Sequence, residues 1–355
     1  MDLDDLDAIG ELDRSRMMDT VGAFPDQLRH AAAISQGVDY PMSDPRQVVV
    51  VGMGGSGISG QLLADWAYDR LDVPVAVVND YHLPHWCGNR TLVLAESYSG
   101  NTEETLSCFE EAVVRGCPTV AVASGGELAR RARDRGVPLV EVPDDLPVPR
   151  AATAYLLVPL LMAVEGTGLA YVSDELRECH GVLSTIRNEV APTVPLASNS
   201  AKQLAHSLFG TVPVVYGQGV LKAVARRWRT QLNENPKMLA RDDVLPECNH
   251  NDTPAWGGSG NADLFSVVLL RDSEEPRAVA DRLELTRDLA FRHARLVAEV
   301  RARGEGALAR MLSTMYVGDY TSLYLAFLRG MDPAPIDAIE DLKRGLKERR
   351  AARDG

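Results

Sequence analysis

The sequence is poor in lysine and cysteine and has no long apolar run, and each shortage argues against a class of protein. Only five of its 37 basic residues are lysines, and 50 acidic residues leave a formal net charge of −13. A nucleic-acid-binding surface needs clustered basic charge, so we expect no nucleic-acid partner. No apolar stretch reaches the roughly 18 residues that a membrane span requires, so we expect no membrane segment.

The five cysteines are scattered along the chain and odd in number. None of them forms a C-x-x-C pair, so we expect neither a disulfide framework nor a zinc site, and no metal. The first residues are acidic and lack the apolar core of a signal peptide, so we expect a cytoplasmic protein. A small anionic ligand stays possible, because local dipoles can outweigh a distant net charge.

Short β-branched runs alternate with helical segments along the chain, which is typical of a doubly wound α/β/α fold with parallel sheets. The length of 355 residues suggests about two domains. We predict two domains of similar plan, covering 1–185 and 186–355, because a strand, a glycine turn and a helix open the pattern again near residue 212. The expected strands are 48–52, 73–80, 91–95, 120–124, 137–142, 212–216, 264–270 and 293–300.

A glycine-rich segment, Gly52–Gly57, follows the first expected strand and opens a helix. Glycine lets backbone N–H groups approach a ligand, and a helix N-terminus favours an anion. The same spacing fits the dinucleotide pattern G-x-G-x-x-G, and Asp80 falls where a ribose-binding acid would lie. This segment alone therefore leaves a phosphate and a dinucleotide both open.

A second polar segment, after the third expected strand, favours the phosphate. It carries three hydroxyls, on Ser97, Ser99 and Thr102, around the start of a helix. Asn101 and Glu104 have the spacing of a capping box, but one hydroxyl would suffice for a cap, whereas three can surround a phosphate. Parallel strands bring both segments to one edge of the sheet. The predicted phosphate-binding residues are Gly54, Gly55, Ser56, Ser97, Ser99 and Thr102.

These motifs resemble those of a known family. Gly54-Gly55-Ser56 together with the segment 96–102 (ESYSGNT) is similar to a sugar-isomerase (SIS) domain. The segments 233–237 (NENPK) and 247–252 (ECNHND) resemble motifs of the bifunctional phosphoglucose/phosphomannose isomerases. The resemblance implies two SIS domains that interconvert glucose 6-phosphate and/or mannose 6-phosphate with fructose 6-phosphate through an enediolate, without a cofactor.

The resemblance also implies which residues carry the proton transfers. One carboxylate can move a proton between adjacent carbons, and this role falls on Glu234, which we expect in a loop after a helix over 221–232. Opening the sugar ring needs a second acid–base group, and His250 suits it because a histidine titrates near pH 6.5. The neighbouring amides of Asn249 and Asn251 could orient that histidine.

Two cations complete the implied catalytic set. Arg150 would stabilise the charge of the enediolate, and Lys343, on the last expected helix, would reach the ring-opening site. From the residues alone, each of these four side chains could equally be an ordinary loop or surface group.

Two positions depart from the family pattern. The family often has Asp-Pro-Thr-Pro where this chain has Asp332-Pro333-Ala334-Pro335. If that threonine hydroxyl shapes the pocket around the sugar C2, its loss could change the preference between the glucose and mannose forms. Asp252 stands where a glutamate is commoner.

The resemblance implies a homodimer in which His250 completes the site of the partner. Glu234 and His250 are only 16 residues apart, so they could also meet within one chain. Two other functions stay open: a NAD(P)-dependent oxidoreductase, which leaves the hydroxyl-rich segment unexplained, and a sugar-phosphate sensor without catalysis.

Overall fold

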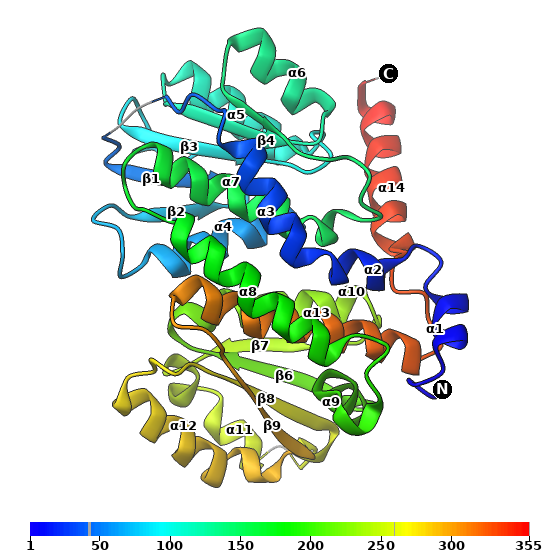
Figure 1. The fold of residues 1–355 in the computed structure, drawn as a ribbon. Helices are drawn as coiled ribbons and strands as arrows, with labels where there is room; N and C mark the ends of the chain where they lie inside the picture. Colours follow the sequence, from blue (N-terminus) through cyan, green and yellow to red (C-terminus); the bar gives the residue numbers. More distant parts are fainter. Residues whose placement is uncertain (42–43, 259, 355) are drawn as a thin grey trace.

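The computed structural model describes residues 1–41, 44–258 and 260–354, except for the side chains of residues 343, 347 and 350–354. Two sheets lie one above the other with helices between them (Figure 1). The first has the strand order β2-β1-β3-β4-β5 and the second β7-β6-β8-β9, and every strand pair is parallel. The strands are β1 (Gln47–Val51), β2 (Val75–Val78), β3 (Thr91–Glu96), β4 (Thr119–Ala123), β5 (Leu139–Glu141), β6 (Val212–Gly217), β7 (Arg241–Val244), β8 (Phe265–Arg271) and β9 (Leu296–Arg301).

Helices cover both faces of each sheet, as a doubly wound fold requires. They are α1 (Leu6–Leu12), α2 (Met17–Gly22), α3 (Phe24–Ser35), α4 (Gly55–Ala67), α5 (Glu103–Val114), α6 (Gly126–Arg135), α7 (Thr153–Gly166), α8 (Ser173–Val190), α9 (Ser200–Leu208), α10 (Lys222–Glu234), α11 (Thr253–Gly258), α12 (Arg277–Leu289), α13 (Ala307–Leu328) and α14 (Asp337–Asp354). No helix within the described residues is long and apolar enough to cross a membrane.

The predicted fold class is confirmed, and all eight expected strands are present. Strand β7 was not predicted from the sequence; it reads Arg-Asp-Asp-Val and lies at the edge of the second sheet. An edge strand has only one neighbour and can expose polar side chains, so it lacks the apolar run that marks a buried strand.

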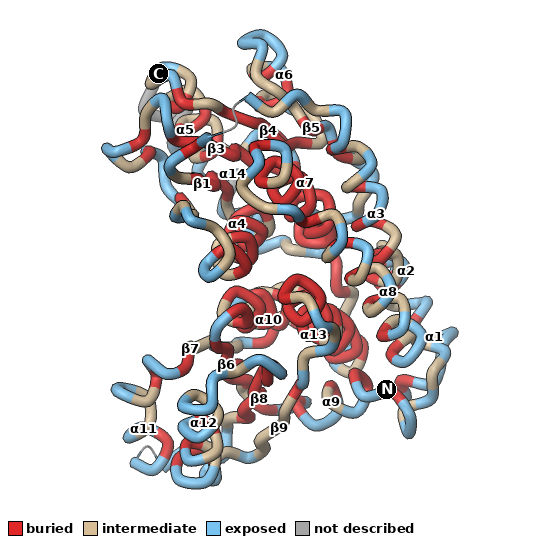
Figure 2. The backbone as a smooth tube through the Cα atoms, turned by 60° about the vertical axis from the view of Figure 1, so that its left-hand side comes forward, coloured by how far each residue is buried: buried red, intermediate tan, exposed pale blue. Residues whose placement is uncertain are grey.

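One hydrophobic core joins the two sheets. Along β1, Val48 and Val50 point into this core, whereas Val49 and Val51 belong to a second cluster beneath α5. The alternation follows from the two-residue period of a strand. Helices α4, α7, α10 and α13 form the buried layer between the sheets (Figure 2).

The predicted boundary between the domains, after residue 185, falls inside α8. That helix is continuous and contacts α3 of the first half and α13 of the second. The division into 1–185 and 186–355 stays a prediction.

Candidate active site

The two polar segments lie side by side because β1 and β3 are neighbours in the first sheet. The Ser56 hydroxyl accepts a hydrogen bond from the backbone N–H of Tyr98 at 3.3 Å, which joins the loops directly. The Ser97 and Thr102 hydroxyl oxygens lie 2.9 Å apart, and the Ser99 hydroxyl accepts from the N–H of Asn101 at 3.3 Å. The structure thus brings all four predicted hydroxyls to one edge of the sheet.

Glycine is required where these loops turn. Gly54 has φ +55° and Gly100 has φ +68°, which L side chains rarely adopt. A Cβ at Gly100 would lie 1.9 Å from the carbonyl oxygen of Gly125, so no other residue fits that position. Both loops therefore take backbone conformations that depend on glycine.

The capping box suggested by Asn101 and Glu104 is wrong. The N-cap of α5 is Thr102, and its side chain makes no capping hydrogen bond to the helix. The Asn101 side chain instead donates to the carbonyl oxygen of Ser99 and accepts from the N–H of Glu127. Helix capping therefore does not account for the three hydroxyls.

A buried acid, which was not identified as functional from the sequence, lies beneath these loops. Glu96, the last residue of β3, is fully buried, and burial raises the pKa of its carboxyl well above the usual range. The Ser59 hydroxyl oxygen lies 2.7 Å from both Glu96 Oε1 and the carbonyl oxygen of Ser56. A hydroxyl donates one hydrogen, so a proton on Glu96 lets Ser59 bond to both.

Arg150 connects the two polar loops to Glu234. A Cβ at Gly55 would lie 3.3 Å from the Cα of Arg150, so the first loop packs directly on its backbone. The side chain is buried, and its Nη1 lies 3.3 Å from Glu234 Oε2. Burial lowers the pKa of Arg150 from its ordinary value, and the neighbouring carboxylate opposes that change.

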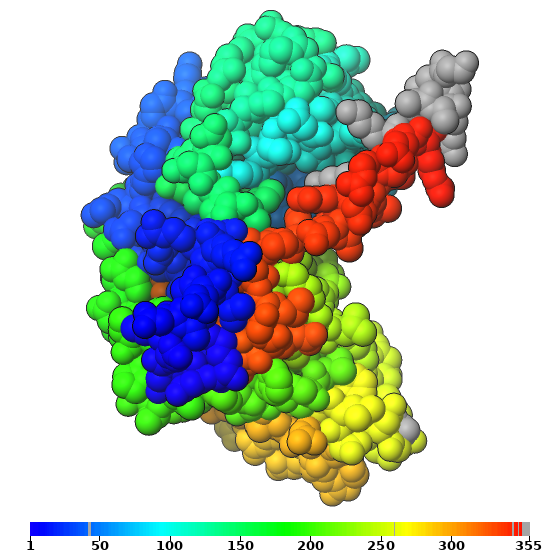
Figure 3. Space-filling view, turned by 90° about the vertical axis from the view of Figure 1, so that its right-hand side faces the viewer, coloured from blue at the N-terminus to red at the C-terminus, as the bar shows by residue number. Residues whose placement is uncertain are grey.

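Glu234 is the last residue of α10. The prediction that it lies in a loop was therefore wrong, because the helix continues two residues beyond its predicted end at 232. Its side chain is 27% exposed, which lets a ligand reach the carboxylate. It lines a hollow of about 550 Å³ at the base of α14, where residues 336–339 form part of the wall. Figure 3 shows α14, in red, standing away from the body of the molecule.

A buried polar network supports Arg150 from behind. Arg227 donates to the carbonyl oxygen of Arg150 at 2.9 Å and forms an ion pair with Asp319 at 3.1 Å. Asn235 accepts from Arg150 Nε at 2.8 Å and donates to the Ser322 hydroxyl. This network was not predicted from the sequence, although Asn235 stands within the NENPK segment that the resemblance singled out.

His250 does not join this group within one chain. It is exposed in a short turn after β7, its side chain forms no hydrogen bond or ion pair with any described residue, and it is absent from the wall of the hollow. The idea that the adjacent amides orient it is wrong: Asn249 donates to Thr286, and Asn251 to Glu247.

Two other predicted positions have different outcomes. Lys343 belongs to α14, but its side chain lies outside the described residues. Asp252 stands where the family more often has glutamate, and the sequence alone indicated no role for it. In the structure it accepts hydrogen bonds from the hydroxyl of Tyr216 and the indole of Trp256. It therefore ties the turn that carries His250 to the second sheet.

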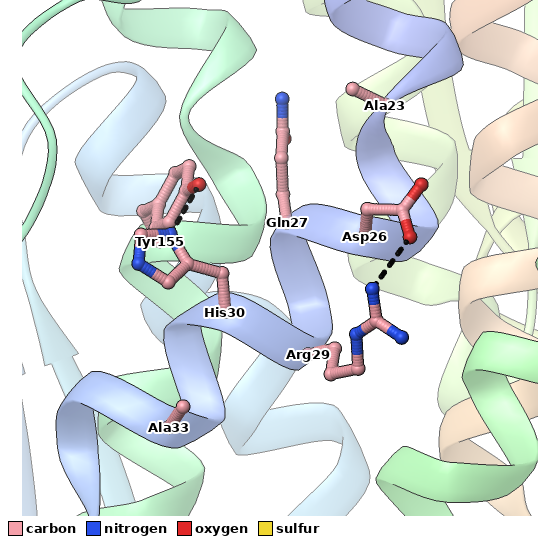
Figure 4. A pocket seen from close by; sticks show the side chains of 7 residues that line it. All are labelled: Ala23, Asp26, Gln27, Arg29, His30, Ala33 and Tyr155. Carbon is pink, nitrogen blue, oxygen red and sulfur yellow. Dashed lines mark hydrogen bonds and ion pairs between the residues drawn. The ribbon is translucent and has the colours of Figure 1, made fainter.

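Another hollow, of about 500 Å³, lies on α3 and α7 and contains none of the predicted residues. There His30 Nδ1 lies 3.0 Å from the Tyr155 hydroxyl, and Asp26 pairs with Arg29 (Figure 4). Size alone would therefore not single out the hollow at Glu234. In the described part of the chain, no three His, Cys, Asp or Glu residues gather in a group that could hold a metal ion.

Comparison with known proteins agrees with this geometry. Residues 197–346 match the model of the bacterial phospho-glucose isomerase C-terminal SIS domain. A protein of Caldicellulosiruptor bescii, named bifunctional phosphoglucose/phosphomannose isomerase, is 39% identical over 94% of this chain and 99% of that protein. This chain belongs to the family of bifunctional phosphoglucose/phosphomannose isomerases.

A further relative supports the family assignment, and a solved structure supports the fold. The family member of Thermoplasma acidophilum is 34% identical over 84% of this chain and 89% of its own length. A solved structure of a hypothetical protein from Thermus thermophilus has a TM-score of 0.77, with 16% identity over 98% of this chain and 94% of that one. At that identity the likeness supports the fold alone, which is the predicted doubly wound α/β/α fold with parallel sheets.

Proposed function

We propose that this protein interconverts glucose 6-phosphate and/or mannose 6-phosphate with fructose 6-phosphate. The observation that carries the proposal is the chain of contacts from the phosphate loops through Gly55 to Arg150 and on to Glu234. It provides an anion site and a carboxylate within one connected structure. The relatives named as isomerases of these sugars support the same reaction.

The sugar phosphate would be held by the loop hydroxyls and the backbone N–H groups at the start of α4. The side chains that would hold it are those of Ser56, Ser97, Ser99 and Thr102. These neutral donors would bind the phosphate dianion without neutralising its charge and without a salt bridge to a cationic side chain. The rest of the sugar would then extend past Arg150 toward Glu234.

In the proposed reaction, the Glu234 carboxylate removes the proton on C2 of the open-chain aldose. The electron pair of that C–H bond forms the C1–C2 double bond, and the carbonyl oxygen becomes negatively charged. Arg150 donates an N–H to that oxygen. Glu234 then returns the proton to C1, while one proton moves between O1 and O2, which yields the ketose.

The remaining roles follow from the family and stay proposals. His250 would act in ring opening from the partner of a homodimer, and its absence from the wall of the hollow within one chain is compatible with that role. Lys343 would act on the same step. Five free, buried thiols are compatible with a reducing, cytoplasmic location.

The direct test is an isomerase assay of each hexose 6-phosphate, with EDTA present. We expect conversion of fructose 6-phosphate to at least one aldose phosphate. Binding of fructose 6-phosphate without turnover would instead favour a sensor. Binding of NADH or NADPH at micromolar concentration would favour an oxidoreductase.

A further inference from the structure

Lys237 has an unusual environment for a lysine on the wall of a hollow. Its ammonium donates to three backbone carbonyl oxygens: those of Asn235 at 3.2 Å, Asp332 at 3.0 Å and Pro333 at 3.1 Å. An ammonium has three N–H donors, so these bonds occupy all of them. The lysine therefore joins the end of α10 to the segment before α14.

The other two lysines with described side chains behave differently. Lys202 pairs with Asp4 at 2.8 Å, and Lys222 pairs with Asp65 at 3.6 Å. Lys237 has no ion pair within the described residues. Burial and the charge of Arg150 lower its pKa from the ordinary value, in that order. Both effects disfavour the charged form of the Lys237 ammonium.

The backbone at Lys237 is strained as well. Its φ is +51°, in the left-handed region that non-glycine residues rarely occupy. Such strain persists where the surrounding contacts require it, and it gathers at functional sites. Here the left-handed turn directs the side chain back across Asn235 to residues 332 and 333.

Both segments that Lys237 joins also hold Arg150. The carbonyl oxygen of Pro333 accepts from Arg150 Nη2 at 2.6 Å and from Lys237 as well. The carbonyl oxygen of Ala334 accepts from the same Nη2 at 3.1 Å, and the Asn235 side chain accepts from Nε. With Glu234 on Nη1, four of the five N–H groups of the guanidinium are occupied. One N–H on Nη1 remains, beside the carboxylate.

We propose that Lys237 is a positioning residue, which clamps the 235 and 332–333 segments so that the remaining N–H of Arg150 points to the oxygen of the enediolate. The inference rests on the proposed isomerase function and adds to it a residue that does not itself touch the sugar. We expect that an arginine cannot replace this lysine, because a planar guanidinium directs its N–H groups differently from the ammonium that bonds all three carbonyls.

The test compares two ligands by calorimetry in wild type and in Lys237→Met. One ligand is the hydroxamate of a five-carbon sugar-acid phosphate, whose planar anionic head imitates the enediolate, and the other is inorganic phosphate. We expect the variant to bind the hydroxamate roughly 10–100-fold more weakly than wild type, which corresponds to the loss of a charge-assisted hydrogen bond. Its affinity for phosphate should stay within about twofold of wild type. Turnover of fructose 6-phosphate should fall mainly in kcat.

Lys202→Met is the matched control, because it also removes a buried ammonium, bonded to Asp4 and to the carbonyl oxygen of Pro192, that contacts none of the segments around Arg150. It should lower the melting temperature and leave the ratio of the two affinities unchanged. Lys237→Arg, which keeps the charge and the bulk, serves if the Met variant does not fold. This variant should also bind the hydroxamate more weakly, by about tenfold.

Three results would overturn the proposal. Unchanged hydroxamate affinity in both Lys237 variants would show that Arg150 needs no such clamp. Equal losses for hydroxamate and phosphate would show that the lysine only maintains the fold. If wild type neither turns over fructose 6-phosphate nor binds the hydroxamate, the isomerase function fails and the positioning role fails with it.

Discussion

Arg150 and Glu234 are 84 residues apart in the chain, yet guanidinium Nη1 lies 3.3 Å from carboxylate Oε2. The arginine is buried, whereas the glutamate is partly open to the hollow at the base of α14. The pair therefore sets a buried cation directly beside an accessible base. This arrangement suits a base that takes a proton and returns it. While Glu234 holds the proton, the substrate carries a negative charge that a nearby cation can stabilise.

Replacing Glu234 by glutamine should lower kcat by roughly 10²–10⁴, because an amide keeps the shape of the side chain but cannot take a proton. The affinity for inorganic phosphate should stay nearly intact, since the loops are unchanged. Steady-state kinetics with fructose 6-phosphate, beside phosphate titration, measures both. Glu340→Gln, an exposed glutamate in the first turn of α14, is the control. Near-normal turnover in Glu234→Gln would remove this residue from the mechanism.

The hydroxyls of Ser97 and Ser99 should hold the phosphate of the substrate. Loss of a hydroxyl bonded to a dianion weakens binding by about 1.5–3 kcal/mol, so Ser99→Ala should raise the KM roughly tenfold or more. The double variant Ser97→Ala, Ser99→Ala should bind fructose 6-phosphate and inorganic phosphate more weakly still. Ser207→Ala, on α9, serves as control because its hydroxyl bonds only to its own helix, at Gln203. Unchanged phosphate affinity in the double variant would count against this phosphate site.

Glu96 should make the stability of the protein depend on pH. Its pKa is raised in the folded state, so its favourable contribution is complete below the unfolded value of about 4.3. Above that value, the free energy of unfolding should fall by up to about 1.4 kcal/mol per pH unit, until the carboxyl ionises in the folded state too.

Glu96→Gln cannot ionise, so this loss should disappear. Urea unfolding should give similar stabilities for variant and wild type near pH 4. By pH 8 the variant should be more stable by at least about 1 kcal/mol. Glu11→Gln, an exposed glutamate on α1, should follow the wild-type curve. Parallel curves for Glu96→Gln and wild type across this range would show that Glu96 is ionised in the folded protein.

Subunit mixing should reveal whether His250 serves the partner. Glu234→Gln and His250→Ala, each inactive alone, are allowed to exchange subunits. In a shared site, each mixed dimer has one site with both changes and one site that is intact. Random mixing makes about half of the dimers mixed, so about a quarter of the wild-type sites should return.

Recovery of activity to that level would support a site completed by the partner. If subunit exchange is verified by mass and no activity returns, the site is built within one chain. The exposed position of His250 would then need a movement of the turn after β7 to reach Glu234.

Local patterns in the sequence determined the layers and the two polar loops at the edge of the first sheet. A parallel strand buried on both faces must be an apolar run, and a tight loop with a positive φ favours glycine, so both features can be read from neighbouring residues. The eight apolar strands and the loops at Gly54 and Ser97 were predictable for this reason. The polar edge strand β7 was not, because its position required no apolar side chains.

Only the tertiary structure decided what surrounds Arg150. Its partners come from residues 234 and 235 and from 333 and 334, which are brought together by the packing of α10, α13 and the segment before α14. The protonated state favoured for Glu96 and the clamp formed by Lys237 likewise depend on burial and on carbonyls distant in the chain. Such properties arise from desolvation and from the direction of hydrogen bonds, and neither exists until the chain has folded.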